Sequence, residues 1–133
     1  MKRGLVLLLL GCSGSTPVRF FGADGALLRE CTQVEEATTP DARRLGLSGR
    51  APLTPREVLV LRYPVVDEAC ITNGSVGFAI TATFVDADGG VVGTERFAAN
   101  ESAARCHRGV LDVYETDVTL AEGVVRVSSS PTP

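Results

Sequence analysis

Short runs of apolar and β-branched residues, separated by turn-forming residues, recur along this sequence. Three of them are VLVLRY at 58–63, FAITATFVD at 78–86 and VLDVYE at 110–115, and Gly, Pro, Asn or Asp residues lie near their ends. Turn signals spaced about every eight to twelve residues are typical of a β-sandwich or a β-barrel. The sequence therefore predicts a mainly β, compact single domain with a sandwich-like or barrel-like fold.

One segment, TTPDARRLGL, follows a different pattern, that of a short helix. Thr39 is a good N-cap, Pro40 suits the first helical position, and Asp41 complements the positive end of the helix dipole. Gly46 follows soon enough to end the helix after about two turns. We expect one short helix near residues 40–47.

The start of the chain has the pattern of a lipoprotein signal peptide. Lys2 and Arg3 precede the apolar run LVLLLL, which is far shorter than the roughly 20 residues that span a bilayer. The stretch LLGC resembles the lipobox, at which bacterial signal peptidase cuts before a cysteine that carries lipid. We expect residues 1–11 to be a signal peptide and residues 12–17 to be lipidated Cys12 and a flexible tether. An ordinary cleaved signal peptide and a cytosolic start are the alternatives.

The remaining chain is long enough for one domain. Removing the first eleven of 133 residues leaves 122, of which 18–127 are predicted to form the β-rich domain and 128–133 a disordered tail. The removed segment holds two of the thirteen basic residues, so eleven arginines oppose sixteen acids and the net charge is near −5. This balance argues against a nucleic-acid partner, because phosphate binding depends on basic residues.

Three cysteines, Cys31, Cys70 and Cys106, lie in the predicted domain. Exported proteins form disulfides, and we favour pairing Cys70 with Cys106 because Cys31 belongs to an early strand. Three reduced, partly buried thiols are the alternative. The chain has no C-x-x-C and one histidine, His107, so no metal site or cofactor is expected. We expect His107 to be an exposed loop residue rather than the base of a catalytic pair with Cys106.

Two arginines, Arg43 and Arg50, lie seven residues apart in TPDARRLGLSGR. This spacing places them on one helical face if the helix continues that far. Two arginines could fork onto a carboxylate or phosphate ligand. They could instead brace the fold by pairing with an acid such as Glu35 or Asp112, which is the interpretation we favour.

The stretch DADGG, which begins at Asp86, resembles the opening of a calcium-binding loop. An EF-hand has a glutamate at its twelfth position, where this chain has Phe97, so the calcium interpretation fails. Two aspartates before two glycines are also typical of a hairpin turn. A hairpin turn is the interpretation we favour.

Three segments, in order, resemble the family known as domain of unknown function 192. TPDARRLGLSGR follows the family pattern T-P-E-E-R-x-R-G-L-M-x-R, FAITATFVDADGGVV resembles its L-D-I-x-F-I-D-x-D-G-x-I-V strand, and GVLDVYE resembles its V-L-E strand with Asp112 in place of glutamate. The resemblance covers roughly residues 34–115 and implies a compact β-rich fold with one short helix, but no established activity. The chain departs from the family in CITNGSVG, which lacks the tryptophan and lysine of W-M-K-N-T, and at Thr81, where the family has aspartate.

These patterns lead to one expected function and two alternatives. We expect an exported, lipid-anchored envelope domain, on the periplasmic face or the cell surface, that binds a small ligand or an envelope protein without catalysis. Its candidate contacts are Arg43, Arg50, Asp86 and Asp112. The first alternative is an envelope enzyme acting on carbohydrate through Asp86 and Asp112, since glycoside hydrolysis uses paired carboxylates. The second is a purely structural lipoprotein.

Overall fold

The computed structural model describes residues 16–129. Eight β-strands and one α-helix make up this part of the chain. In chain order, the elements are β1 (Val18–Gly22), β2 (Leu27–Cys31), β3 (Gln33–Ala37), α1 (Pro40–Leu45), β4 (Glu57–Ile71), β5 (Ile80–Val85), β6 (Val91–Phe97), β7 (Arg105–Thr116) and β8 (Val124–Ser128).

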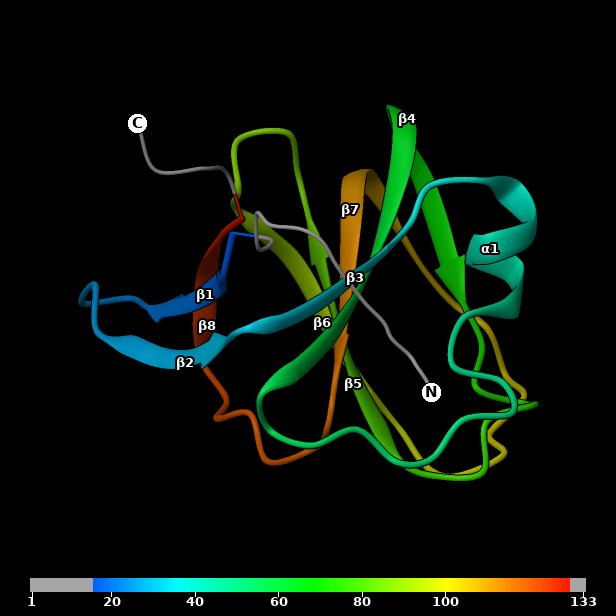
Figure 1. Ribbon diagram of the computed structural model, residues 1–133. Coiled ribbons are helices and arrows are strands. Elements are labelled where there is room, and N and C mark those ends of the chain that lie inside the picture. The colour runs from blue at the N-terminus through cyan, green and yellow to red at the C-terminus, as the bar shows by residue number, and fades with distance from the viewer. Residues whose placement is uncertain (1–15, 130–133) are drawn as a thin grey trace.

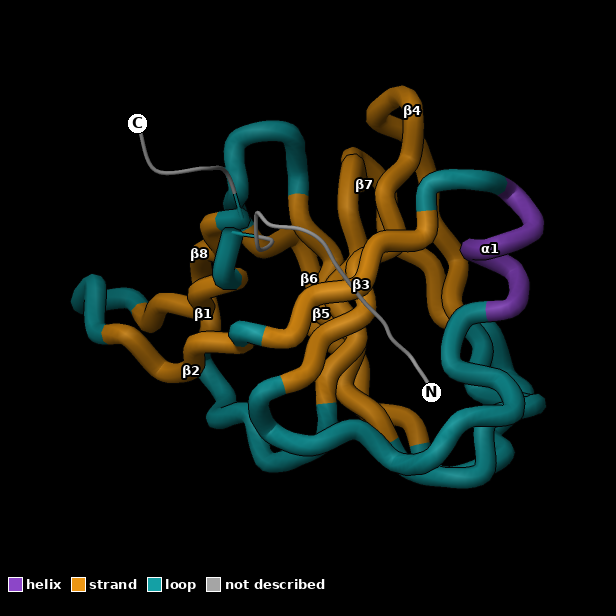
Figure 2. Tube along the Cα trace, in the orientation of Figure 1, coloured by secondary structure: helices purple, strands orange, loops and turns teal. Residues whose placement is uncertain are grey.

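The strands form two sheets, with β1, β2 and β8 on one side of the view in Figure 1. The small sheet has the order β2-β1-β8, and the large sheet has the order β3-β4-β7-β5-β6. All pairings are antiparallel apart from the parallel pair of β3 and β4. Figure 2 shows α1, in purple, beside the large sheet. The prediction of a mainly β single domain with sandwich-like sheets and one short helix is confirmed, and the sheets of residues 16–129 do not close into a barrel.

The two sheets are joined in two places. Only Thr32 separates β2 from β3, so one run of chain passes from the small sheet to the edge of the large sheet. Elsewhere, Gly90 forms an isolated bridge with Arg126 of β8, and the N–H of Val127 donates to the carbonyl of Gly89 at 2.9 Å. These connections hold the small sheet over one face of the large sheet.

Each face of the large sheet has its own hydrophobic core, and β7 contributes to both. Tyr114 packs with Phe20 and Val60 in the core between the two sheets. Val113 packs in the second core, on the opposite face, where residues from α1 and its following loop also contribute. Successive side chains of a strand point to opposite faces, so Glu115 lies on the same side as Val113.

Strand β4 is longer than the sequence suggested, because it continues through Pro64. Its pairing with β7 stops at Arg62 and resumes at Asp67 with an irregular register. Proline has no N–H to donate, so it is tolerated where a strand is unpaired. Figure 2 shows the tube of β4 turning sharply near its label.

The predicted helix near residues 40–47 is present as α1, with the expected N-cap. The Oγ1 atom of Thr39 accepts a hydrogen bond from the N–H of Ala42 at 3.1 Å, and Pro40 is the first helical residue. The helix ends at Leu45 because Gly46 adopts a φ of 50°, a left-handed value that favours glycine.

The domain boundaries from the sequence lie close to the ends of the described part. The first strand begins at Val18, and the last includes Ser128, which the sequence analysis assigned to the tail. The predicted signal peptide and Cys12 lie within residues 1–15, and the rest of the tail at 130–133, outside the described residues. Among residues 16–129, no helix has the length and apolar character needed to cross a membrane.

Candidate functional site

A pocket of about 240 Å³ lies between α1, the large sheet and the loop that follows β4. Buried apolar side chains form much of its wall, together with the chain just after the helix. The lining includes Leu47, Leu61, Tyr63, Ile71, Val76 and Glu115. Apolar walls around a few polar groups are typical of small-molecule sites.

Glu115 is the buried acid of this pocket, with only 5% of its surface exposed. Its partner on the neighbouring strand β5 is Ala82. Burial raises the pKa of Glu115 to about 7, and the positive charge of Arg50 opposes part of that shift. Within the described residues the carboxylate has no hydrogen-bond or ion-pair partner, which is unusual because buried charges are normally paired.

Two arginines, Arg43 and Arg44, also line the pocket, but their guanidinium groups contact residues other than Glu115. Arg43 donates to two backbone carbonyl oxygens, at 2.9 and 2.8 Å, and its guanidinium lies 4.8 Å from the centre of the Tyr63 ring. Arg44 pairs with Asp41 on the exposed side of the helix. Neither arginine therefore neutralises the buried carboxyl by direct contact.

Asn73, which also lines the pocket, adds a second acceptor without a donor. Its amide group donates to the carbonyl oxygens of Phe78 and Ala98, at 3.0 and 2.9 Å. Its Oδ1 atom has no partner, although the residue is fully buried. The hydroxyls of Ser48 and Ser75 are hydrogen-bonded to each other. Asn73 therefore adds a buried acceptor without a donor to the wall of the pocket.

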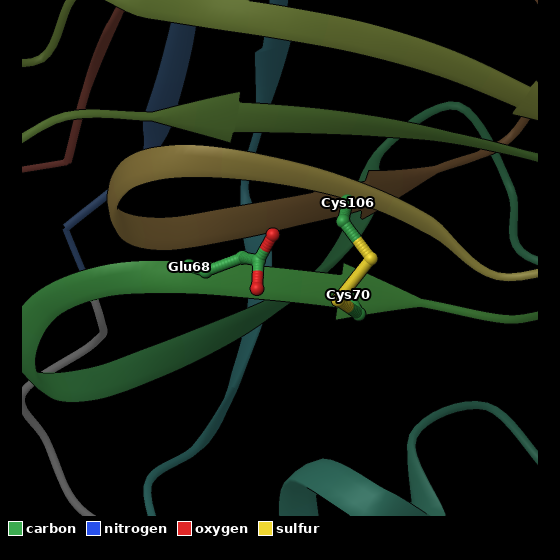
Figure 3. Close-up of side chains that lie close together, drawn as sticks. All are labelled: Glu68, Cys70 and Cys106. Atoms are coloured by element: carbon green, nitrogen blue, oxygen red, sulfur yellow. A yellow bond between two sulfur atoms is a disulfide. The ribbon is translucent and has the colours of Figure 1, made fainter.

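Cys70, one of the residues that line the pocket, is part of a disulfide, which Figure 3 shows. Cys70 of β4 is joined to Cys106, directly opposite on β7, which is the pairing favoured from the sequence. Cys31 remains free and buried. Glu68 lies beside the bridge, and the potential ligand atoms of the three labelled residues lie within 4.8 Å of one another. Because the two sulfurs are bonded to each other, neither is a thiolate that could bind a metal ion.

The structure separates Arg43 and Arg50 and gives each its own partner. Helix α1 ends at Leu45, so a shared helical face does not apply. Arg50 makes a forked pair with Glu35, the first of the two acids considered in the sequence analysis. Arg43 binds backbone carbonyls instead of an acid. Both arginines brace the fold and do not converge on one ligand position.

Asp86 and Asp112 line one small polar hollow of about 160 Å³. The Oδ1 atom of Asp86 accepts hydrogen bonds from the N–H groups of Asp88 and Gly90, at 2.8 and 2.9 Å, which is the arrangement of a hairpin turn. The Oδ2 atom of Asp112 lies 3.2 Å from Arg62, and burial raises the pKa of this carboxyl. The two aspartates are therefore close, but each already has partners.

His107 lies in β7 and is half-buried, so the expectation of an exposed loop residue is wrong. Its Nε2 atom lies 2.7 Å from Glu95, and its ring packs against Phe84 with centroids 4.5 Å apart. Gly93 makes room for the ring, since a Cβ atom there would overlap the imidazole. Cys106 is in a disulfide, so it is not a nucleophile for His107.

A larger hollow of about 440 Å³ lies beside the loop that joins β7 to β8. The two arginines that line this hollow, Arg96 and Arg105, already have hydrogen-bond or ion-pair partners. Arg96 donates to the carbonyls of Val118 and Leu120, at 2.9 and 3.0 Å, and Arg105 pairs with acids of its own neighbourhood. Within residues 16–129 no buried acid without a partner lines this hollow, so the pocket of Glu115 is the stronger candidate site.

Asp112, the acid of β7 predicted to contact a ligand, does not line this pocket, whereas Glu115 does. Asp112 and Glu115 lie three residues apart, which places them on opposite faces of a strand. The signal was present, because Glu115 continues the alternation that buries Val113 and so puts an acid at a core position. Asn73 carried no comparable signal, since Asn before Gly is typical of a turn.

Two solved structures have a similar fold. One is a protein of unknown function from Novosphingobium aromaticivorans DSM 12444, with a TM-score of 0.75, 20% identity, and coverage of 84% of this chain and 83% of that one. The other is a protein from Sinorhizobium meliloti 1021 described as a candidate transcription regulator, with a TM-score of 0.75, 20% identity, and coverage of 89% and 97%. At this identity the similarity shows the fold alone.

No curated protein matches the chain. The model of the family DUF192, described as an uncharacterized ACR, matches residues 23–126. The match spans β2 through most of β8 and includes both α1 and Glu115. The chain therefore belongs to the DUF192 family, the domain of unknown function 192 that its sequence resembled.

Proposed function

We propose that this protein is an exported, lipid-anchored domain of the bacterial envelope that binds a small ligand in the pocket of Glu115 without catalysis. The observation that carries the proposal is a buried carboxyl with no partner in a largely apolar pocket. Desolvating a charge is costly unless another group compensates for the lost water. A ligand that contacts Glu115 would supply this compensation.

The disulfide supports export. Cys70 and Cys106 are solvent-exposed, and they are joined although 36 residues separate them in the sequence. Such bonds persist in oxidising compartments outside the cytosol. Together with the lipobox-like LLGC, this supports attachment through Cys12 at the periplasmic face or the cell surface.

The composition of the pocket supports binding rather than catalysis. The lining contains no histidine, and its cysteine is bonded to another cysteine. Nucleophilic catalysis needs a nucleophile within hydrogen-bond reach of a base, and the Ser48 and Ser75 hydroxyls contact only each other. A carboxyl in an apolar pocket can still orient a ligand.

A second candidate function is hydrolysis of carbohydrate at the hollow of Asp86 and Asp112. The observation in its favour is that both carboxylates line the same hollow. Against it, Asp86 is held by two backbone N–H groups and Asp112 by Arg62. A general acid and a nucleophile need carboxyls that are free to contact the sugar.

The anchor is tested by detergent phase partitioning of the full chain expressed in a bacterial host. We expect the wild type to enter the detergent phase and Cys12→Ala to remain in the aqueous phase. Ser15→Ala is the matched control and should partition as the wild type does. Equal partitioning of the wild type and Cys12→Ala would contradict lipid attachment at this residue.

The pocket is tested by screening a library of small fragments with ¹H–¹⁵N NMR. We expect bound fragments to shift the amide signals of Leu47, Ile71 and Glu115. The Glu115→Gln variant should bind these fragments more weakly. Glu122→Gln, an exposed acid outside the pocket, should leave binding unchanged. Fragments that shift only signals around Asp86 would favour the second candidate. A library without any bound fragment would favour a structural or protein-binding lipoprotein.

A further inference from the structure

The pocket of Glu115 has an imbalance of hydrogen-bonding groups that restricts what it can bind. Two acceptors, the carboxylate of Glu115 and the Oδ1 atom of Asn73, have no donor among the described residues. The amide hydrogens of Asn73 are used by backbone carbonyls. A buried acceptor without a donor is costly, so a ligand that provides donors gains the most.

We infer that the ligand of this pocket is a primary amine on a short apolar stem, with its ammonium group bound to the carboxylate of Glu115. This inference rests on the proposed binding function and specifies its ligand class. An ammonium has three donors and no acceptor, and its charge-assisted bond to a carboxylate is stronger than a bond between neutral groups.

The walls of the pocket fit the apolar stem. Leu47, Leu61, Ile71 and Val76 are all buried and all line the pocket. A volume of about 240 Å³ accommodates a small molecule such as phenethylamine. Contact with these side chains removes the apolar surface of the ligand's own stem from water, at roughly 25 cal/mol per Å².

Several charged or titratable groups surround Glu115. The titratable or charged neighbours are Arg43 and Arg44 from α1, Arg50 from the following loop, and Tyr63 from β4. Arg50 is held by Glu35 and Arg44 by Asp41, so each of these positive charges is balanced by its own partner. Arg43 faces backbone carbonyls and the Tyr63 ring. The carboxylate is therefore the group left for an ammonium.

Protonation of Glu115 should make the affinity for an amine depend on pH. Burial raises the pKa of this carboxyl to about 7, so the group is mostly neutral at pH 5.5 and mostly ionised at pH 8. The ammonium of an alkylamine stays charged across this range. Binding should therefore strengthen by roughly tenfold or more from pH 5.5 to pH 8, the opposite of what a carboxylic-acid ligand would show.

The experiment titrates the full chain with phenethylammonium, 2-phenylethanol and 3-phenylpropionate, with binding followed by ¹H–¹⁵N NMR at pH 5.5 and 8. We expect phenethylammonium to shift the signals of Ile71 and Glu115 at pH 8 and to bind at least about tenfold more weakly at pH 5.5. Glu115→Gln should abolish this pH dependence. Glu68→Gln is the matched control, because it removes an exposed negative charge near the pocket without changing its lining.

Three results would overturn the inference. If the alcohol or the acid shifts the pocket signals and the amine does not, the ligand class is wrong but the binding function stands. If the amine binds equally to the wild type and Glu115→Gln, the carboxylate is not its partner. If none of the three compounds shifts the pocket signals, the amine inference fails, and the fragment screen decides separately whether the pocket binds small molecules.

Discussion

Glu115 of β7 lies directly opposite Leu59 of β4 in their antiparallel register, so a carboxyl and an isobutyl group share the face of the large sheet that packs against α1. The strand pairing determines which face of the large sheet carries the Glu115 side chain. Moving it to the other face would require a shift of register, which would also move Val113 into the core between the two sheets. The carboxyl is therefore a fixed element of the core, and its protonation is coupled to folding.

Replacement of Glu115 by glutamine should change how stability depends on pH. The folded state raises the carboxyl pKa from 4.5 to about 7, so it binds more protons than the unfolded state in this window. This group therefore lowers the free energy of unfolding as pH rises from 4.5 to 7, by about 3 kcal/mol in total. Urea unfolding at pH 4 and pH 8 should show Glu115→Gln near wild-type stability at pH 4 and more stable at pH 8. A variant less stable than the wild type at pH 8 would contradict this.

Replacement of Arg50 by glutamine should raise the pKa of Glu115 further. The charge of Arg50 favours the ionised carboxyl, so removing it favours the neutral form. The ¹³C chemical shift of the Glu115 carboxyl, followed against pH, measures the change directly. Arg19→Gln, in the small sheet, is the control and should leave the titration unchanged. A lower pKa of Glu115 in Arg50→Gln than in the wild type would contradict the stabilisation of the ionised carboxyl by Arg50.

Removal of the disulfide should destabilise the domain without displacing its core. Cys70 and Cys106 close a loop with a sequence separation of 36, and both are exposed. A cross-link of this span contributes about 2–4 kcal/mol, chiefly by restricting the unfolded chain. Urea unfolding of the Cys70→Ser/Cys106→Ser double variant should show this loss, with near-native circular dichroism retained. A double variant as stable as the oxidised wild type would disprove the contribution.

Cys31 should resist alkylation until the domain unfolds. The side chain is fully buried, and burial raises the pKa of the thiol to about 11, so the reactive thiolate is scarce at pH 8. Peptide mass spectrometry after iodoacetamide treatment should find Cys31 unmodified in the native protein and modified in urea. Cys70 and Cys106 should stay unmodified in both unless a reductant is present. Rapid native labelling of Cys31 would show that this core opens readily.

The local features of the fold could be predicted because neighbouring residues determine them. Thr39 and Pro40 set the start of α1, and Gly46 sets its end, within one short segment. Apolar runs between turn signals likewise gave the β-rich class. The continuation of β4 through Pro64 could not be predicted, because it depends on the gap in pairing between β4 and the distant strand β7.

The candidate site was harder to predict because it depends on which face of a strand is buried. Arg50 pairs with Glu35, as the favoured bracing interpretation expects, whereas Arg43 binds backbone carbonyls instead of an acid. Asp112 was named as a candidate contact and Glu115 was not, although both belong to the predicted strand VLDVYE. The alternation along VLDVYE places Glu115 on the same face as Val113, and the strand pairing shows that this face is the one beside the helix.

The position of β1 has a mechanical consequence for a domain attached through its N-terminal side. β1 is the middle strand of the small sheet and is hydrogen-bonded to β2 on one side and β8 on the other. A pulling force that enters at Val18 must shear both rows of hydrogen bonds together, whereas a force on an edge strand would peel one row bond by bond. Under the proposed attachment through Cys12, two rows of hydrogen bonds would therefore carry a load applied to the first strand.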